Sequence, residues 1–125
     1  MVSILIIEDD VSLRRLYEII ISLEGYQIFQ STGNGENAVK LFKTASEKPD
    51  LILIDHRMPI KTGLETAEEL LEYDAKSKII FASADSSIKD KALSIGAKSF
   101  LLKPFNSDVL IREIESILSL QDTIT

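Results

Sequence analysis

The sequence contains no cysteine, no excess of basic residues and no long apolar run. Without cysteine there is no disulfide framework, no thiolate nucleophile and no cysteine-bound zinc. Its 14 lysines and arginines are outnumbered by 20 aspartates and glutamates, which gives a net charge of −6. That sign argues against direct binding of nucleic acid, because neutralising phosphate groups requires a basic face.

Membrane signals are lacking as well. No apolar run approaches the roughly 18 residues that a membrane span needs. The apolar start at residues 1–7 has no basic residue before it, and acidic residues end it too early for a signal peptide. We therefore expect a cytoplasmic protein that makes no membrane contact.

What is present is the composition of an ordinary globular domain. Hydrophobic residues make up 45% of the 125 residues, which suits one domain with a sizeable core. No linker, repeat or low-complexity segment divides the chain. We expect one domain over residues 1–120 and a short, loose C-terminal tail over residues 121–125.

Short apolar runs alternate with helical patterns along the chain. The predicted strands are 3–8, 26–31, 50–55, 78–83 and 98–102, and each is followed by apolar residues at helical spacing. Strict alternation predicts an α/β fold in which helices cover both faces of a parallel sheet. We expect the doubly wound, flavodoxin-like strand order 2-1-3-4-5, which binds ligands where the first and third strands end.

The helical patterns also predict which side chains are buried. The first helix ends at Gly25, and we expect its buried stripe to consist of Leu13, Leu16, Tyr17, Ile20 and Leu23. Ile19 and Ile21 fall outside that stripe and mark at most a dimer patch. Asn106 or Ser107 is expected to cap the last helix.

Polar side chains stand where the predicted strands end: Glu8 and Asp9 at the first, Asp55 at the third, Ser83 at the fourth and Lys103 after the fifth. The carboxyl ends of parallel strands meet at one edge of the sheet. We therefore expect all of these side chains on one rim.

Three carboxylates on that rim would repel one another. Two unit charges about 4 Å apart cost on the order of 4 kcal/mol at an effective dielectric near 20. Lys103 offsets about one of the charges, and a divalent cation would offset the rest. An all-oxygen site with few protein ligands suits Mg²⁺. Acids carrying Mg²⁺ beside a lysine would attract a phosphate, which bare acids would repel.

Four motifs occur in order along the chain: Glu8-Asp9, Asp55-His56-Arg57-Met58-Pro59 with Gly63, Ser83-Ala84, and Lys103-Pro104-Phe105. In this order and spacing they resemble the receiver domain of two-component response regulators. The resemblance covers residues 2–120.

The resemblance implies a role for each of these residues. Asp55 would accept a phosphoryl group from a phosphohistidine. Asp9 and Asp55 would bind Mg²⁺ directly, Glu8 through a water molecule, and Arg57 through its backbone carbonyl.

Further residues would serve the phosphoryl group and the switch. Lys103 would neutralise a phosphoryl oxygen, and the hydroxyl of Ser83 would donate a hydrogen bond to another. Similar domains hold the peptide bond before Pro104 in cis. Phe100 matches the aromatic switch position, where the family often has tyrosine, so this chain lacks a hydroxyl there. Glu8 replaces the commoner aspartate.

Two residues flank the expected entrance of the site. Arg57 lies two residues after Asp55, and Asp85 lies two residues after Ser83. We predict that Arg57 and Asp85 pair across the entrance and slow the attack of water on the phosphorylated aspartate. His56, the only histidine, is expected to point away from Asp55 because side chains alternate along a strand.

The function implied by the resemblance is that of a stand-alone phosphorylation switch. Its partners would be a sensor histidine kinase or phosphotransfer protein and a downstream effector protein, and the chain would be a monomer or a weak homodimer. Phosphorylation would change the face formed by the fourth helix, the fifth strand and the fifth helix. The chain would not be an enzyme beyond catalysing its own phosphorylation and dephosphorylation.

Three alternatives remain open. A phosphatase of the haloacid-dehalogenase type needs a second acid two residues after its nucleophile, where this chain has Arg57. A flavodoxin-type binding module needs hydroxyls and glycine amides after the first strand, where this chain has Glu8, Asp9 and Asp10. A degenerate receiver would keep the fold without being phosphorylated.

Overall fold

The computed structural model describes the backbone of residues 1–124 and the side chains of residues 1–119. The strands are β1 (Ser3–Ile7), β2 (Gln27–Thr32), β3 (Leu51–Ile54), β4 (Ile79–Ser83) and β5 (Ser99–Leu102). The helices are α1 (Val11–Leu23), α2 (Gly35–Thr44), α3 (Gly63–Tyr73), α4 (Lys89–Ile95) and α5 (Ser107–Ile124), with a 3₁₀ turn, η1 (Ser86–Ile88), before α4. The ends of every predicted strand lie within one residue of the observed ends.

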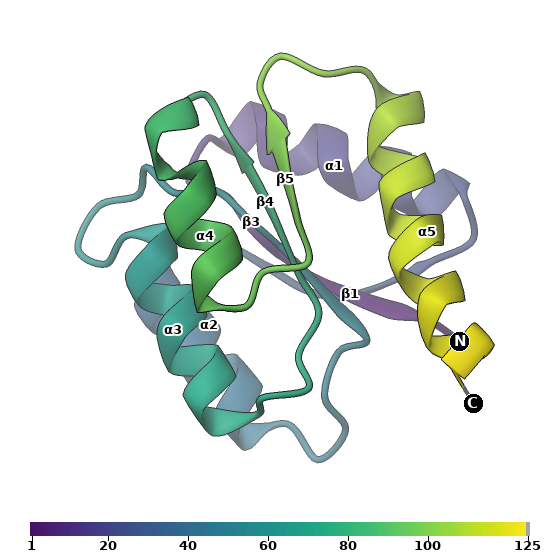
Figure 1. Cartoon of the computed structure of the whole chain (residues 1–125), viewed down its shortest axis with the longest axis horizontal. Helices are drawn as coiled ribbons and strands as arrows, with labels where there is room; N and C mark the ends of the chain where they lie inside the picture. Colours follow the sequence, from purple (N-terminus) through teal and green to yellow (C-terminus); the bar gives the residue numbers. More distant parts are fainter. Residues whose placement is uncertain (125) are drawn as a thin grey trace.

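The strands form one parallel sheet in the order β2-β1-β3-β4-β5, which confirms the predicted order. Figure 1 shows α1 and α5 on one face of the sheet and α2, α3 and α4 on the other. All strands therefore point their carboxyl ends toward the same edge, and the order reverses between β1 and β3. That reversal leaves a crevice for a ligand at the ends of these two strands.

The two central strands, β1 from Ile4 onward and β3, are apolar at every position because both of their faces are covered. Alternate side chains of β1 enter different cores: Leu5 and Ile7 pack on the α2–α3–α4 side, whereas Ile4 and Ile6 pack on the α1–α5 side. All of them are fully buried. A strand covered on both faces has no polar face to offer solvent.

Side-chain caps set where the helices begin. Asp10 accepts a hydrogen bond from the backbone amide of Leu13 at 3.0 Å and so starts α1 directly after the acid pair. Thr62 and Glu65 form a reciprocal capping box at the start of α3. Asn106 caps α5 by accepting from the amide of Val109 at 3.0 Å, which agrees with one of the two predicted alternatives.

The predicted face of α1 is partly wrong. Tyr17 and Ile21 are the buried residues of this helix, whereas Leu16 is 50% exposed and Leu23 is 81% exposed. Ile21 falls outside the predicted stripe, but it is fully buried. The residues of α1 that contact the core are Tyr17 and Ile21, with Leu13 and Ile20 partly buried beside them.

The C-terminal end of the chain also differs from the prediction. A loose tail is predicted over residues 121–125, but α5 continues through Ile124. Thr125 lies outside the described residues.

Gly63 brings the start of α3 against the end of β3, and we expect Gly63→Ala to disturb both. A Cβ atom there would overlap the carbonyl oxygen of Asp55 and lie 2.6 Å from Cα of His56. Because backbone cannot yield as a flexible side chain can, the free energy of unfolding should fall by about 2 kcal/mol or more in urea denaturation.

Gly25→Ala is the matched comparison for that variant. Gly25 has φ of 90°, and a Cβ atom added there would meet nothing within 4 Å, so only backbone strain of about 1 kcal/mol is expected. An equal or smaller loss for Gly63→Ala than for Gly25→Ala would contradict the close-approach argument.

Candidate functional site

The side chains of the site are fixed by backbone hydrogen bonds that continue the sheet beyond its strands. The amide of Asp55 donates to the carbonyl of Ile7 at 3.0 Å, and the amide of Lys103 donates to the carbonyl of Ser83 at 2.9 Å. The amide of Glu8 likewise donates to the carbonyl of Thr32 at 3.0 Å. Each charged residue is thus held in register with the neighbouring strand, although its own strand has ended.

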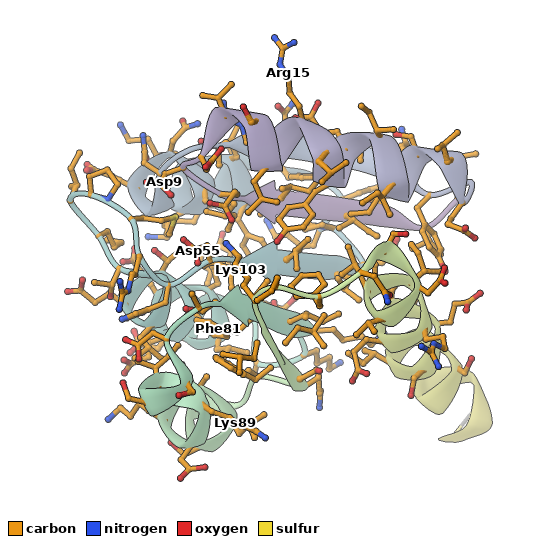
Figure 2. All side chains as sticks on the ribbon, turned by 90° about the horizontal axis from the view of Figure 1, so that it is seen from above. Asp9, Arg15, Asp55, Phe81, Lys89 and Lys103 are labelled. Atoms are coloured by element: carbon orange, nitrogen blue, oxygen red, sulfur yellow. The ribbon has the colours of Figure 1, made fainter. Side chains whose placement is uncertain are left out.

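Three carboxylates meet at this edge. Glu8, Asp9 and Asp55 each place one oxygen so that the three oxygens lie within 4.8 Å of one another. Glu8 is 2% exposed and Asp55 is 6% exposed, while Asp9 is exposed. In Figure 2 Asp55 and Lys103 lie side by side, with Asp9 on the side toward α1. The crowding expected from the strand order is therefore present.

Lys103 bridges two of these carboxylates. Its Nζ lies 2.9 Å from Oε1 of Glu8 and 3.4 Å from Oδ1 of Asp55. The Lys103–Pro104 peptide bond is cis, as the resemblance implied. One ammonium therefore serves two buried acids, and a net negative charge remains for another cation to balance.

The electrostatics of the two buried acids follow from this arrangement. Burial is the largest cause that raises the pKa of both the Glu8 and the Asp55 carboxyl above the ordinary value, and Lys103 opposes that rise. The charge of Asp55 raises the pKa of Glu8 further, and the charge of Asp9 raises that of Asp55. The ionised cluster is therefore costly to the fold.

The donor set fits a hard divalent cation. Three carboxylate oxygens within a few ångströms of one another offer only oxygen ligands, and the exposed Asp9 leaves one side of the group open to water. A cation that binds few protein oxygens and keeps several waters has these requirements. The geometry supports a divalent metal site at this edge.

Arg14 is a residue of the site that the sequence did not reveal. Its Nη1 donates to the backbone carbonyl of Glu8 at 2.9 Å, and the amide of Asp10 donates to Oε2 of Glu8 at 3.2 Å. These bonds fix both the backbone and the side chain of Glu8. An arginine one turn into a helix is too common on surfaces for its position in the sequence to indicate this contact.

Ser83 and Phe100 are the two residues for which the resemblance implies a role in the switch. Ser83 is fully buried, and its Oγ accepts a hydrogen bond from the amide of Asp85 at 3.1 Å. Phe100 is half-buried, packs against the core on the α2–α3–α4 side, and stands opposite Phe81 in the β4–β5 ladder.

The two residues predicted to flank the entrance, Arg57 and Asp85, form an ion pair. Nη2 of Arg57 is 3.9 Å from Oδ2 of Asp85, which confirms that the two pair. The side chain of Arg57 is 72% exposed, so the contact lies at the surface. His56 is held by α3: its Nδ1 accepts from the amide of Leu64 at 3.4 Å.

Comparison with known proteins decides the family. A model of the response regulator receiver domain matches residues 4–115. The chain belongs to this family. Receiver domains are signalling domains of two-component systems that interact with histidine kinases and effectors, and they are not enzymes in the ordinary sense. The phosphatase and flavodoxin alternatives are therefore set aside.

Curated relatives of this receiver domain include chemotaxis proteins. This chain is 33% identical over 118 residues to the chemotaxis protein CheY of Bacillus subtilis, and the match covers 93% of this chain and 97% of that protein. It is 35% identical over 115 residues to the positive alginate biosynthesis regulatory protein of Pseudomonas aeruginosa, covering 90% of this chain but 46% of that protein.

Solved structures agree with the fold. The response regulator TrrA of Thermotoga maritima, in complex with Mg²⁺ and BeF, has a TM-score of 0.82 and 33% identity, covering 93% of this chain and 98% of that one. The CheX–CheY–BeF₃–Mg²⁺ complex of Borrelia burgdorferi contains a chain with a TM-score of 0.89 and 26% identity. The match covers 94% of this chain and 89% of that one. Within residues 1–124, no helix of this receiver domain has the length and apolarity to cross a membrane.

The raised pKa of Asp55 predicts how the stability of the receiver domain depends on pH. An acid whose folded-state pKa is raised costs stability as the pH rises through and above its unfolded-state pKa, about 4. We expect Asp55→Asn to raise the free energy of unfolding at neutral pH by about 1 kcal/mol, and by less near pH 4.

Urea unfolding at both pH values measures that difference, with Glu47→Gln as a control that removes a negative charge at an exposed position. A gain that does not change with pH, or a loss of stability at neutral pH, would show that the charge of Asp55 is not costly.

Proposed function

We propose that this receiver domain is a phosphorylation switch in which Asp55 accepts a phosphoryl group from a phosphohistidine. The donor would be a sensor histidine kinase or a phosphotransfer protein. The observation that carries the proposal is the buried carboxylate of Asp55, which lies 3.4 Å from Lys103 beside two further acids. Complexes of similar receivers with BeF₃ or BeF and Mg²⁺ support it.

The metal of the proposed site is Mg²⁺. Asp9 and Asp55 would hold it directly, Glu8 through a water molecule, and Arg57 through its backbone carbonyl. When bound, Mg²⁺ neutralises the carboxylates and the oxygens of the phosphoryl group. The chemistry of the donor set supports this assignment, because its ligands are all oxygens and one of the three acids is open to solvent.

Phosphoryl transfer requires mainly positioning and charge balance from the protein. A carboxylate oxygen of Asp55 forms a bond to phosphorus while the bond from phosphorus to the donor imidazole breaks, and an acyl phosphate results. Lys103 moves one N–H from Asp55 to a phosphoryl oxygen. The hydroxyl of Ser83 donates to another phosphoryl oxygen.

The switch would begin when the Ser83 hydroxyl gives up its present hydrogen bond. In the present structure Oγ of Ser83 accepts from the amide of Asp85, which fixes the loop between β4 and η1. Movement of the hydroxyl toward the phosphoryl group releases that amide and opens space at the end of β4. Phe100 then turns inward, which changes the α4–β5–α5 face.

The effector protein would bind the altered α4–β5–α5 face. Lys89, Lys91 and Lys98 are exposed on α4 and just before β5, so an acidic partner surface suits it. The net charge of −6 favours a protein partner over nucleic acid. A monomeric or weakly dimeric state in the cytoplasm is part of the proposal.

The phosphoryl transfer can be tested by intact mass. The purified domain is incubated with a small phosphodonor, with and without Mg²⁺, alongside Asp55→Asn. We expect wild type to gain one phosphoryl group only with Mg²⁺, and Asp55→Asn to gain none. A gain of mass in Asp55→Asn would refute the proposal. So would the absence of a gain in wild type with Mg²⁺ when both a small donor and a phosphorylated histidine kinase have been tried.

The Arg57–Asp85 pair predicts a kinetic effect. An exposed ion pair contributes at most about 1 kcal/mol, so Arg57→Ala should speed loss of the phosphoryl group from Asp55 by up to about fivefold. Asp85→Ala should act in the same direction, although it also removes a cap: Oδ1 of Asp85 accepts from the amide of Ser87 at 3.0 Å.

Arg15→Ala is the matched control for that rate, because Arg15 extends from α1 away from the site (Figure 2). Loss of the phosphoryl group is followed by mass after the donor is removed. If Arg57→Ala and Asp85→Ala both decay at the wild-type rate, the pair does not restrict water.

A further inference from the structure

Tyr17 carries a buried hydroxyl that the proposed chemistry has not used. The residue is 3% exposed, and its ring stacks on Phe105 with centroids 6.3 Å apart and planes 5° apart. Its hydroxyl oxygen has no hydrogen-bond partner among the residues that the structure describes. A buried hydroxyl without a partner costs stability, so a leucine or phenylalanine would serve the core better.

Tyr17 borders the site through a cavity that it shares with Lys103. Tyr17 and Lys103 line the same cavity of about 500 Å³, which is otherwise bordered mainly by apolar side chains of α1 and of the segment between β5 and α5. Burial, and to a lesser extent the charges of Glu8 and Asp55, raise the pKa of the Tyr17 hydroxyl. The group therefore stays protonated and can both donate and accept a hydrogen bond.

Lys103 has donors to spare in this structure. An ammonium carries three N–H groups, and Nζ contacts two acceptors, Glu8 and Asp55. No third acceptor contacts it among the described side chains. After phosphoryl transfer Lys103 would keep its contact with Glu8 and move one N–H from Asp55 to a phosphoryl oxygen. Its third N–H would remain for an acceptor in the cavity that Lys103 shares with Tyr17.

We propose that the Tyr17 hydroxyl is a positioning group that accepts a hydrogen bond from Lys103 once Asp55 is phosphorylated. The inference rests on the proposed function. Tyr17 would then be unpaired in the resting state and paired in the phosphorylated state. Its hydroxyl would raise the free energy of the resting state and lower that of the phosphorylated one, which favours the switch.

Tyr17→Phe tests this directly, because it removes the hydroxyl and keeps the ring that stacks on Phe105. Tyr26→Phe is the matched control. Tyr26 is a half-buried tyrosine directly before β2, packed against the α1–α5 core at the edge of the sheet opposite the site. Three quantities are measured for wild type and both variants: the resting melting temperature, the affinity for beryllofluoride with Mg²⁺, and the nitrogen NMR signal of the Lys103 ammonium.

Tyr17→Phe should keep or raise the resting melting temperature by a few degrees, since removing an unpaired buried hydroxyl relieves its cost. Its affinity for beryllofluoride should fall about tenfold, the size expected for loss of a hydrogen bond to a charged group. In wild type the ammonium signal should sharpen and shift on binding beryllofluoride, and in Tyr17→Phe that response should be lost. Tyr26→Phe should match wild type in affinity and in the ammonium signal.

A lower resting melting temperature for Tyr17→Phe with unchanged affinity would overturn the inference, because the hydroxyl would then be a structural group of the resting state. Unchanged affinity and an unchanged ammonium response would overturn it as well, while leaving the proposed function intact. Failure of wild type to bind beryllofluoride would instead refute the proposed function and this inference together.

Discussion

The structure depends on the balance between three crowded carboxylates and one lysine at the carboxyl edge of the sheet. Glu8 and Asp55 are almost completely buried, and Nζ of Lys103 lies 2.9 Å and 3.4 Å from their oxygens. One positive charge does not neutralise this group, and burial raises the pKa of both acids. In the proposed function, the remaining negative charge attracts a divalent cation and, with that cation, a phosphoryl group.

The rest of the fold holds that unfavourable cluster together. Parallel pairing of β1 with β3 brings the two acidic strand ends next to each other, and backbone bonds beyond the strands keep Glu8 and Asp55 in register. The fully buried central strands supply the stability that the cluster costs. Proteins commonly keep such locally destabilising groups where they act.

Much of this could be predicted from the sequence, because the strands are short, apolar and punctuated by charge. Strict alternation indicated a parallel sheet, and the strand order is the common one for an open sheet of five strands. The meeting of Glu8, Asp9, Asp55 and Lys103 followed from that order. The buried face of α1 could not be predicted in this way, since Leu16 and Ile21 are both apolar and only the packing of the helix on the sheet decides which one is buried. The contact of Arg14 with Glu8 and the unpaired hydroxyl of Tyr17 depend on three-dimensional packing that no spacing rule encodes.

The charge balance itself can be measured most directly by an NMR titration of the side-chain carboxyl carbons of Glu8 and Asp55, without and with Mg²⁺. Without the ion, both carboxyls should titrate above the ordinary range for their type, and Mg²⁺ should lower the pKa of both. Ordinary titration of both groups in the absence of Mg²⁺, with no change on adding it, would contradict the account.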